Sequence, residues 1–323
     1  MLNVLLTIDT EVYPLHPNWR EENLATDLAR DIDGRTPQGN FGLSFQLNLL
    51  RAHNLTASFF VESLFASAAG LAPLTKIVDQ IQSAQSEVQL HLHPEWLAWT
   101  DHPILPPNHR QQLRQFTATE QSTLIAAGLT NLGAAGSKTI HAFRAGDFAA
   151  NSDTLTALNQ NGLRYDTSYN ACYPNSFTDA PQLSALQPTQ IANLHEFPIS
   201  YWKDCLGNTR HAQLCSTSSS ELQGALLAAH RANWHSFVIV SHSFELLKNR
   251  RQRISNPTPD PIVVNRFKSL CQFLDDHRDK FHTCGFNDLD PAEIPQTQIE
   301  EPLRSPVRRT LWRFAEQAYR RIA

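Results

Sequence analysis

The sequence predicts an α/β protein, a (β/α) barrel of about seven parallel strands with a C-terminal helical tail. Short apolar runs alternate along the 323 residues with longer amphipathic stretches, a pattern typical of strand-then-helix units and a parallel sheet. Seven or eight such units can be counted, and that number favours closure into a barrel. Hydrophobic residues make up 41% of the chain, which is ample for a core.

The apolar runs and the amphipathic stretches give the expected elements in chain order. The expected strands are Leu2–Ile8, Leu55–Val61, Val88–His91, Thr139–Phe143, Leu163–Tyr165, Leu194–Ile199, Ser236–Val240 and Phe281–Gly285. The expected helices are Gly42–Leu50, Leu74–Ile81, Gln111–Ala126, Asp153–Gln160, Ser219–Ala232 and Val264–Leu274.

Two polar segments interrupt this rhythm, and each directly follows a candidate site. Tyr13–Gly39 comes after the first acidic cluster, and Pro103–Pro107 comes after a pair of histidines. Long loops in compact domains are usually functional or disordered, and these positions favour loops that cover a site.

Charge and cysteine usage exclude some classes of function. The net charge is -4 and the pI is about 6.4, so the whole chain shows no electrostatic footprint for nucleic acid. The N-terminus shows no basic leader and no apolar stretch that could span a membrane. Five scattered cysteines without a CxxC pair indicate reduced thiols, and we expect a cytoplasmic protein.

Histidines and carboxylates gather where three of the apolar runs end. Asp9 and Glu11 follow the first run, His91 and His93 end a second, and His242 ends a third. In parallel α/β folds, ligands bind beyond the carboxyl ends of the strands. Two imidazoles and an acid at this edge predict a catalytic metal site with three protein ligands.

The motifs in their order resemble the polysaccharide deacetylase superfamily, also called the NodB-homology or carbohydrate esterase family 4 fold. The segments that carry the resemblance are TIDTE, ASFFVES, EVQLHLHPEW, FRAGDF, RYDTSY and VSHSFELL. The resemblance spans roughly residues 2–290, which predicts a barrel domain at 1–290 and a C-terminal extension at 291–323. It implies a distorted (β/α) barrel that hydrolyses N-acetyl groups of amino sugars with a divalent metal.

The resemblance also implies roles for particular residues. Asp9 aligns with the catalytic base, and Arg144 with the arginine that braces it, although Ala145 and Gly146 replace the usual prolines. His242 aligns with the general acid of the last motif. Either Asp166 or Asp204 is expected to steady Arg144 or His242.

The metal ligands implied by the resemblance depart from the family pattern. Thr10 stands where the family usually has a metal-binding Asp, and Glu11 is the next acid along the chain. His91 matches the first histidine of an HxxxH motif whose partner position is Glu95. His93 is the alternative, because i and i+2 side chains of a strand share a face. The strand period favours His93 over Glu95 beside His91, and the resemblance to family branches with an acid one place further on implies Glu11 as the third ligand.

The expected function is a metal-dependent N-deacetylase, with Zn²⁺ as the first choice of ion and Co²⁺ or Ni²⁺ as alternatives. Its partner would be an N-acetylated sugar or glycan precursor. Two alternatives are a hydrolase of another amide or imide bond on the same fold, and a carbohydrate-binding relative without turnover.

The segment after Pro302 is predicted to form a basic amphipathic helix outside the barrel. Its apolar positions at helical spacing are Leu311, Phe314, Ala315, Ala318, Tyr319 and Ile322, and its arginines are Arg308, Arg309, Arg313, Arg320 and Arg321. One interpretation is that the apolar stripe packs on the barrel and the arginines are solvated. The other is peripheral contact with anionic lipid.

Overall fold

The computed structural model describes most of the chain. The described residues are 1–13, 24–100, 103–106, 109–173, 176–177, 179–180, 182–248, 257–295, 299 and 301–322, without the side chains of 321 and 322.

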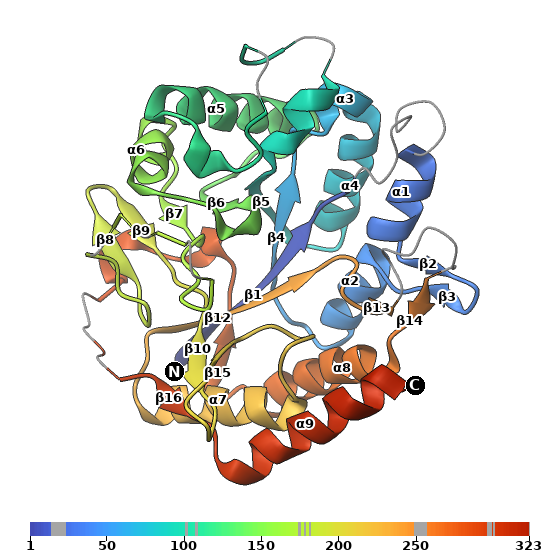
Figure 1. Cartoon of the computed structure of the whole chain (residues 1–323), viewed down its shortest axis with the longest axis vertical. Helices are drawn as coiled ribbons and strands as arrows, with labels where there is room; N and C mark the ends of the chain where they lie inside the picture. Colours follow the sequence, from blue (N-terminus) through green and yellow to red (C-terminus); the bar gives the residue numbers. More distant parts are fainter. Residues whose placement is uncertain are drawn as a thin grey trace.

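A curled sheet of parallel strands lies at the centre of the molecule (Figure 1). Its order is β12-β1-β4-β5-β6-β7-β9-β8, and β15 pairs with the amino-terminal part of β1. The strands are β1 (Leu2–Thr10), β4 (Ser58–Glu62), β5 (Glu87–Leu92), β6 (Ala142–Ala145), β7 (Tyr165–Asp166), β8 (Thr189–Ile191), β9 (Leu194–Glu196), β12 (Ser236–His242) and β15 (Phe281–Thr283). All eight predicted strands are therefore present, and within the described part of this sheet only the β8–β9 pair is antiparallel.

Loop contacts, and not a continuous ladder, close the gap between β9 and β12. The Ser200 N–H donates to the Val238 carbonyl at 3.2 Å, and the Val238 N–H donates to Ser200 Oγ at 2.9 Å. One pleat further on, the Val240 N–H donates to the Ala212 carbonyl at 2.9 Å. The predicted distorted α/β barrel is confirmed, and the irregular junction between β9 and β12 is part of its distortion.

Helices cover the outside of the sheet (Figure 1). They are α1 (Leu24–Asp31), α2 (Leu43–Ala52), α3 (Ala66–Ala69), α4 (Leu71–Ser83), α5 (Ala118–Ala134), α6 (Ser152–Gln160), α7 (Ser219–Arg231), α8 (Pro261–Asp276) and α9 (Val307–Ile322). Short strands outside the main sheet are β2 (Arg35–Thr36), β3 (Gly39–Asn40), β10 (Tyr201–Lys203), β11 (Thr209–His211), β13 (Leu247–Lys248), β14 (Thr258–Pro259) and β16 (Leu303–Arg304).

Helix α5 begins later than its predicted start at Gln111. Thr117 caps the helix: its hydroxyl accepts from the Glu120 N–H, and the Glu120 carboxylate accepts from the Thr117 N–H in return. This reciprocal pair is a capping box, which satisfies backbone donors that a helix start otherwise leaves unpaired. The sequence Thr117-Ala-Thr-Glu120 carries the signal that fixes the true start.

The polar insertion after β1 is not a plain loop, which corrects the prediction for Tyr13–Gly39. Its residues 14–23 lie outside the described part, but the remainder contains α1 and the β2–β3 hairpin. The Ser243 hydroxyl donates to the Asp31 carbonyl at 2.7 Å, which places the end of α1 beside the carboxyl end of β12. In the second segment, Pro103–Pro107, residues 104–106 form bends, and Pro107 itself lies outside the described part.

The predicted C-terminal helix is confirmed as α9, but its orientation is the reverse of the first interpretation. The Arg313 side chain is buried, whereas Leu311 and Trp312 are each 58% exposed. The interpretation in which the apolar stripe packs on the barrel and the arginines are solvated is therefore wrong. Among the described residues, no helix combines the length and the apolar character that crossing a membrane requires.

Candidate metal centre and active site

The candidate site lies at the carboxyl ends of β1, β5, β6 and β12. Asp9 of β1 stands opposite His242 of β12, and His91 of β5 stands opposite Arg144 of β6. Because these strands are parallel neighbours in one curled sheet, their carboxyl ends meet at one edge. The sheet topology thus brings together side chains that are up to 233 positions apart in the sequence.

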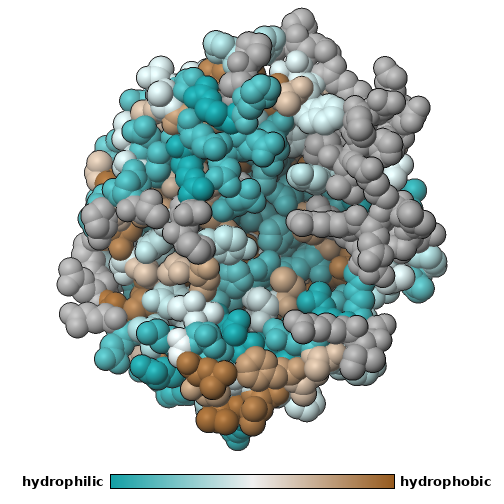
Figure 2. Space-filling model, viewed as in Figure 1, coloured by the Kyte–Doolittle hydropathy of each residue, from teal (hydrophilic) through white to brown (hydrophobic). Residues whose placement is uncertain are grey.

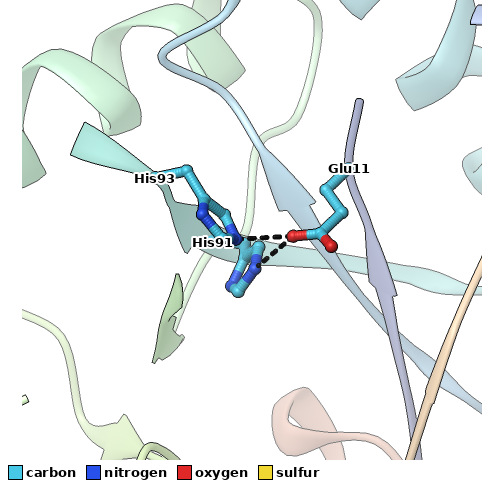
Figure 3. Close-up of side chains that lie close together, drawn as sticks. All are labelled: Glu11, His91 and His93. Carbon is cyan, nitrogen blue, oxygen red and sulfur yellow. Dashed lines mark hydrogen bonds and ion pairs between the residues drawn. The ribbon is translucent and has the colours of Figure 1, made fainter. Parts of the chain in front are cut away.

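Glu11, His91 and His93 form one cluster at this edge (Figure 3). Glu11 Oε2 lies 3.2 Å from His91 Nε2 and 2.5 Å from His93 Nε2. One potential ligand atom from each residue falls within 4.8 Å of the others. The prediction that the i and i+2 histidines point to one place is consistent with this arrangement, since β5 ends at Leu92 and Pro94 begins a 3-10 turn.

The outer nitrogen of each imidazole is held by the protein. His91 Nδ1 lies 2.8 Å from the Arg144 carbonyl, and His93 Nδ1 lies 2.6 Å from Glu95 Oε1. Such partners fix the orientation and tautomer of metal-binding histidines and leave Nε2 for the ion. Glu95 thus bonds to the outer side of His93, away from the point where the Nε2 atoms meet.

The charges of the cluster balance one another. Burial by itself raises the pKa of Glu11, but the charge of His93 and hydrogen bonds from both imidazoles hold that pKa well below its ordinary value. Burial likewise opposes the protonated form of His93, but Glu11 and Glu95 raise its pKa well above the ordinary value. These effects favour a protonated His93 beside an ionised Glu11, and a divalent cation can replace that proton, since metal binding displaces protons from its ligands.

Glu62, at the end of β4, binds backbone N–H groups next to this cluster. Its carboxylate accepts hydrogen bonds from the backbone N–H groups of Leu64 and Phe65, each at 2.9 Å, and from that of His93 at 3.4 Å. Burial raises the pKa of Glu62 to about 8, although His93 and the backbone donors act in the opposite direction. The sequence analysis gave Glu62 no role, although it is an acid at a strand end.

Asp9 is fixed by Arg144. Arg144 Nη1 lies 2.6 Å from Asp9 Oδ1, and the fully buried guanidinium also donates to Thr7 Oγ1 at 2.8 Å. Nε donates to the Thr167 carbonyl at 3.1 Å, and the guanidinium carbon lies 4.5 Å from the centre of the Phe60 ring. These contacts leave Arg144 one position, and they aim the Asp9 carboxylate.

His242 completes the row of strand-end residues. Its Nε2 lies 3.9 Å from Asp9 Oδ2, and its side chain is 21% exposed. The ring stacks on Phe244 with centroids 5.1 Å apart. The imidazole can therefore reach both Asp9 and a molecule bound at the mouth of the barrel.

Asp166 and Asp204 have other partners. Asp166 accepts from Ser168 Oγ at 2.5 Å and faces Glu196 in the neighbouring strand. Burial raises the pKa of Asp166 to about 6, and burial together with the Asp166 charge raises the pKa of Glu196 well above its ordinary value. Asp204 pairs with Arg210 and Arg313.

Thus Asp166 and Glu196 form a buried pair of acids that favours retention of a proton, because two adjacent buried carboxyls cannot both ionise easily. In the described part of the chain, no hydrogen bond joins either aspartate to Arg144 or His242, although the charge of Arg144 acts on Asp166 and opposes the larger effect of burial on its pKa. Glu196 was also missed by the sequence analysis, and its position opposite Asp166 depends on strand pairing that one sequence does not reveal.

Gly146 leaves room for His93. A Cβ atom built on Gly146 would lie 2.6 Å from Cε1 of the His93 ring, closer than side chains tolerate. The next two residues, Asp147 and Phe148, have positive φ angles of 55° and 54°. This tight turn at the end of β6 brings the backbone against the imidazole.

Aromatic rings line the edge of the site. Phe148 follows the turn that touches His93, and its ring centroid lies 4.9 Å from that of Tyr173. On its other side, Tyr173 lies 5.7 Å from the His211 ring, and Tyr173 is 42% exposed. An exposed ring in this place can pack against the face of a sugar.

No known protein family matches this chain by sequence, and no curated protein matches it. Among solved structures it resembles one described provisionally as a polysaccharide deacetylase from Mycobacterium smegmatis, with a TM-score of 0.55 and 17% identity over 93% of this chain and 94% of that one. A family 4 carbohydrate esterase from Streptomyces lividans in complex with acetate gives a TM-score of 0.40 and 14% identity, over 87% and 91%.

A family 4 pseudoenzyme from Bacillus anthracis gives a TM-score of 0.41 and 11% identity, over 94% of this chain and 69% of that one. At 17% identity, the likeness to the Mycobacterium smegmatis structure concerns the fold. The fold of the polysaccharide deacetylase superfamily, predicted from the sequence, is confirmed by the first of these matches.

Proposed function

We propose that this chain, which has the polysaccharide deacetylase fold, is a metal-dependent hydrolase that removes N-acetyl groups from an amino sugar or glycan precursor. The observation that carries the proposal is the convergence of His91 Nε2 and His93 Nε2 on Glu11, beside an aspartate that Arg144 braces. These groups supply the three needs of amide hydrolysis: a polarised carbonyl, an activated water and a proton for the departing amine.

The donor set fits a divalent ion. Two imidazole nitrogens and one carboxylate are the ligands of many catalytic zinc sites, which keep a further position open. Zn²⁺ is therefore the first choice, with Co²⁺ or Ni²⁺ as alternatives. When bound by Glu11, His91 and His93, such an ion supplies a Lewis acid that polarises the acetyl carbonyl and acidifies water.

Asp9 is the proposed general base. Its contact with the buried Arg144 guanidinium holds the carboxylate in one orientation. A base must lie within hydrogen-bond reach of the proton that it takes, and the rigid Thr7 and Thr167 contacts of Arg144 keep Asp9 at the mouth of the barrel.

His242 is the proposed general acid. The strand order is β12-β1-β4-β5. Along this edge of the sheet, His242 therefore lies on one side of Asp9, and His91 and His93 lie on the other. Its partly exposed ring can donate a proton to the nitrogen that leaves the acetyl group.

The aromatic rings at the edge of the site favour a carbohydrate as the substrate. Tyr173 presents an exposed ring between Phe148, at the metal side, and His211. Aromatic faces of this kind pack on the apolar faces of sugar rings. Substrate binding through Tyr173 predicts that Tyr173→Ala raises KM, whereas Tyr173→Phe keeps it.

The experiment is a measurement of acetate release from a panel of N-acetylated sugars by the Zn²⁺-loaded protein, with Asp9→Asn as the matched control. The proposal expects release from at least one sugar, lost in the control. Release of another amine from simple amides or imides would favour the alternative hydrolase. Sugar binding without release from any substrate would favour a binding relative without turnover.

A further inference from the structure

Helix α9 is held on the barrel by its charged face. Arg313 Nη2 lies 2.9 Å from Asp204 Oδ2, and its Nε lies 2.9 Å from Glu221 Oε2. All three side chains are buried. Guanidinium–carboxylate pairs of this kind fix both position and orientation.

The same face makes two further ion pairs. Glu316 Oε2 lies 2.6 Å from Arg266 Nη2 of α8, and Arg320 Nε lies 2.5 Å from Asp260 Oδ2, the residue that caps α8. Arg320 also donates to the Cys215 carbonyl at 3.3 Å. These contacts extend along the helix and leave it no freedom to rotate its opposite face inward.

The outward face of α9 is mostly apolar. Its large apolar side chains are Val307, Leu311, Trp312, Phe314 and Tyr319, all exposed. Ala315 and Ala318 lie between them and are exposed as well. Figure 2 shows the result as a brown patch at the lower edge of the molecule, where Figure 1 places α9. We refer to these seven residues as the α9 outer face.

An amphipathic helix on a globular protein normally turns its apolar stripe to the core. Here the protein buries the polar stripe and exposes the apolar one, although exposure of large apolar side chains to water is unfavourable. Such an orientation is explained if the α9 outer face contacts an apolar environment in the working state of the protein.

The size of the α9 outer face favours a lipid surface over a protein partner. A helix of 16 residues is about 24 Å long and about 10 Å wide, so one face covers on the order of 240 Å². A stable protein–protein interface buries about 800 Å² on each partner. A membrane has no such minimum area, because each apolar side chain inserts on its own.

The charge distribution favours an anionic lipid surface. Of the six arginines in residues 302–323, Arg304 and Arg308 are exposed, whereas Arg313 and Arg320 are paired with carboxylates of the barrel. The single acid of this segment, Glu316, pairs with Arg266 and accepts a hydrogen bond from Trp312 Nε1 at 2.9 Å. Trp312 and Tyr319 add the amphipathic rings that prefer a membrane–water boundary.

The position of α9 relates it to the active site. Helices α7 and α8 each precede a strand that runs parallel to β1, so their first turns lie at the carboxyl ends of the strands. Helix α9 contacts Glu221 in the first turn of α7 and Asp260 at the start of α8. It therefore lies at the same end of the barrel as Asp9 and His242.

We propose that the α9 outer face docks the protein on the surface of an anionic membrane, with its apolar side chains inserted at the boundary of the head groups and acyl chains. Helices of this kind lie in the plane of the interface, with the apolar side about 5–10 Å deep. The inverted orientation of α9 on the barrel presents that side outward. Docking then brings the mouth of the barrel beside the membrane surface. This inference does not depend on the proposed deacetylase activity.

The test is co-sedimentation of the full-length protein with vesicles of phosphatidylglycerol in phosphatidylcholine. The triple variant Leu311→Gln/Trp312→Gln/Phe314→Gln is expected to partition roughly tenfold or more weakly, because each apolar side chain adds its own transfer free energy. These side chains are exposed, so the variant is expected to fold. Leu71→Gln, at an exposed apolar position of α4, is the matched control and is expected to bind like the unaltered protein.

Salt and fluorescence separate insertion from simple charge attraction. Insertion predicts that part of the binding persists at about 1 M salt, where charges are screened beyond about 3 Å. It also predicts a blue shift of tryptophan emission with vesicles that Trp312→Phe removes while binding is kept. The proposal is overturned if the protein does not bind the vesicles, or if the triple variant binds as well as the control. A dimer in solution that the triple variant dissociates would also overturn it.

Discussion

The metal cluster of Glu11, His91 and His93 holds a carboxylate against cations, and so does the α9 seam, by which we mean the ion pairs that Arg313, Glu316 and Arg320 make with the barrel. The two regions use different cations. In the cluster, Glu11 lies between the imidazoles of His91 and His93. In the seam, buried carboxylates such as Glu221 lie against the guanidinium of Arg313. A divalent cation can displace the proton of an imidazole, whereas a guanidinium keeps its protons in proteins.

The consequence is a difference in what each region can do. Once its proton leaves, the cluster offers two nitrogen donors and a carboxylate to a metal ion. The seam stays closed at every pH at which its carboxylates are ionised, so it serves attachment alone. Similar geometry thus gives an exchangeable site in one place and a permanent joint in the other.

The largest expected effect is on catalysis next to the cluster. Asp9→Asn should lower kcat by about 10²–10⁴-fold, the usual range for removal of a general base. Metal content should stay unchanged, because Asp9 is not among the clustered ligands. The protein should still fold, since Arg144 keeps Thr7 and Thr167 as partners. A loss of turnover well under tenfold would show that another group takes the proton.

Mutations in the α9 seam should change the stability of the protein and not its catalytic chemistry. Arg313→Met leaves the buried Glu221 without its guanidinium partner, and we expect the free energy of unfolding to fall by about 3–5 kcal/mol. The exposed Arg308→Met is the control and should change stability by about 0.5 kcal/mol or less. Denaturant unfolding measures both, and equal values for the two variants would mean that the seam does not hold α9.

Mutation can distinguish the two candidate metal ligands that follow β5, which are His93 and Glu95. His93→Ala should abolish tight metal binding, whereas Glu95→Gln should retain the ion with an affinity about 10–100-fold lower, because Glu95 only orients His93. Calorimetric titration with Zn²⁺ measures both. Loss of the ion in Glu95→Gln with retention in His93→Ala would reverse the ligand assignment.

The smallest expected effect concerns the buried pair of Asp166 and Glu196. A carboxyl whose folded pKa is raised binds its proton more tightly in the folded state, so stability falls as the pH rises from about 4, the unfolded value, through about 6, the folded pKa of Asp166. The raised pKa of Glu196 extends this loss to higher pH.

Glu196→Gln keeps a polar partner for Asp166 and removes the second acid. We therefore expect it to flatten the decline and to stabilise the protein at pH 8 by on the order of 1 kcal/mol, with little change at pH 4. Thermal unfolding across this range gives the comparison, and parallel pH profiles for the two proteins would rule out the retained proton.

The sequence was sufficient to predict the strands and the cluster of Glu11, His91 and His93, and the reason is physical. Apolar runs identify buried parallel strands, and the carboxyl ends of such strands meet, so Glu11, His91 and His93 could be expected together. The alternation of side chains along β5 favours His93 over Glu95, which the geometry supports. Localisation, by contrast, stays a prediction.

The remaining features depend on contacts between distant parts of the chain. The orientation of α9 depends on carboxylates at Asp204, Glu221 and Asp260, which no local pattern connects to Arg313 or Arg320. An amphipathic pattern shows that a helix has two faces, but it does not show which one the protein covers. The buried pair of Asp166 and Glu196 was missed for the same reason.

The most direct test of the account is the metal content of the purified protein, measured by elemental analysis together with acetate release before and after chelation. The account predicts about one tightly held divalent ion per chain, at a site with three protein ligands, and its loss in His91→Ala. Chelation should abolish acetate release, and Zn²⁺, Co²⁺ or Ni²⁺ should restore it. Full activity after exhaustive removal of metal would contradict the role assigned to Glu11, His91 and His93.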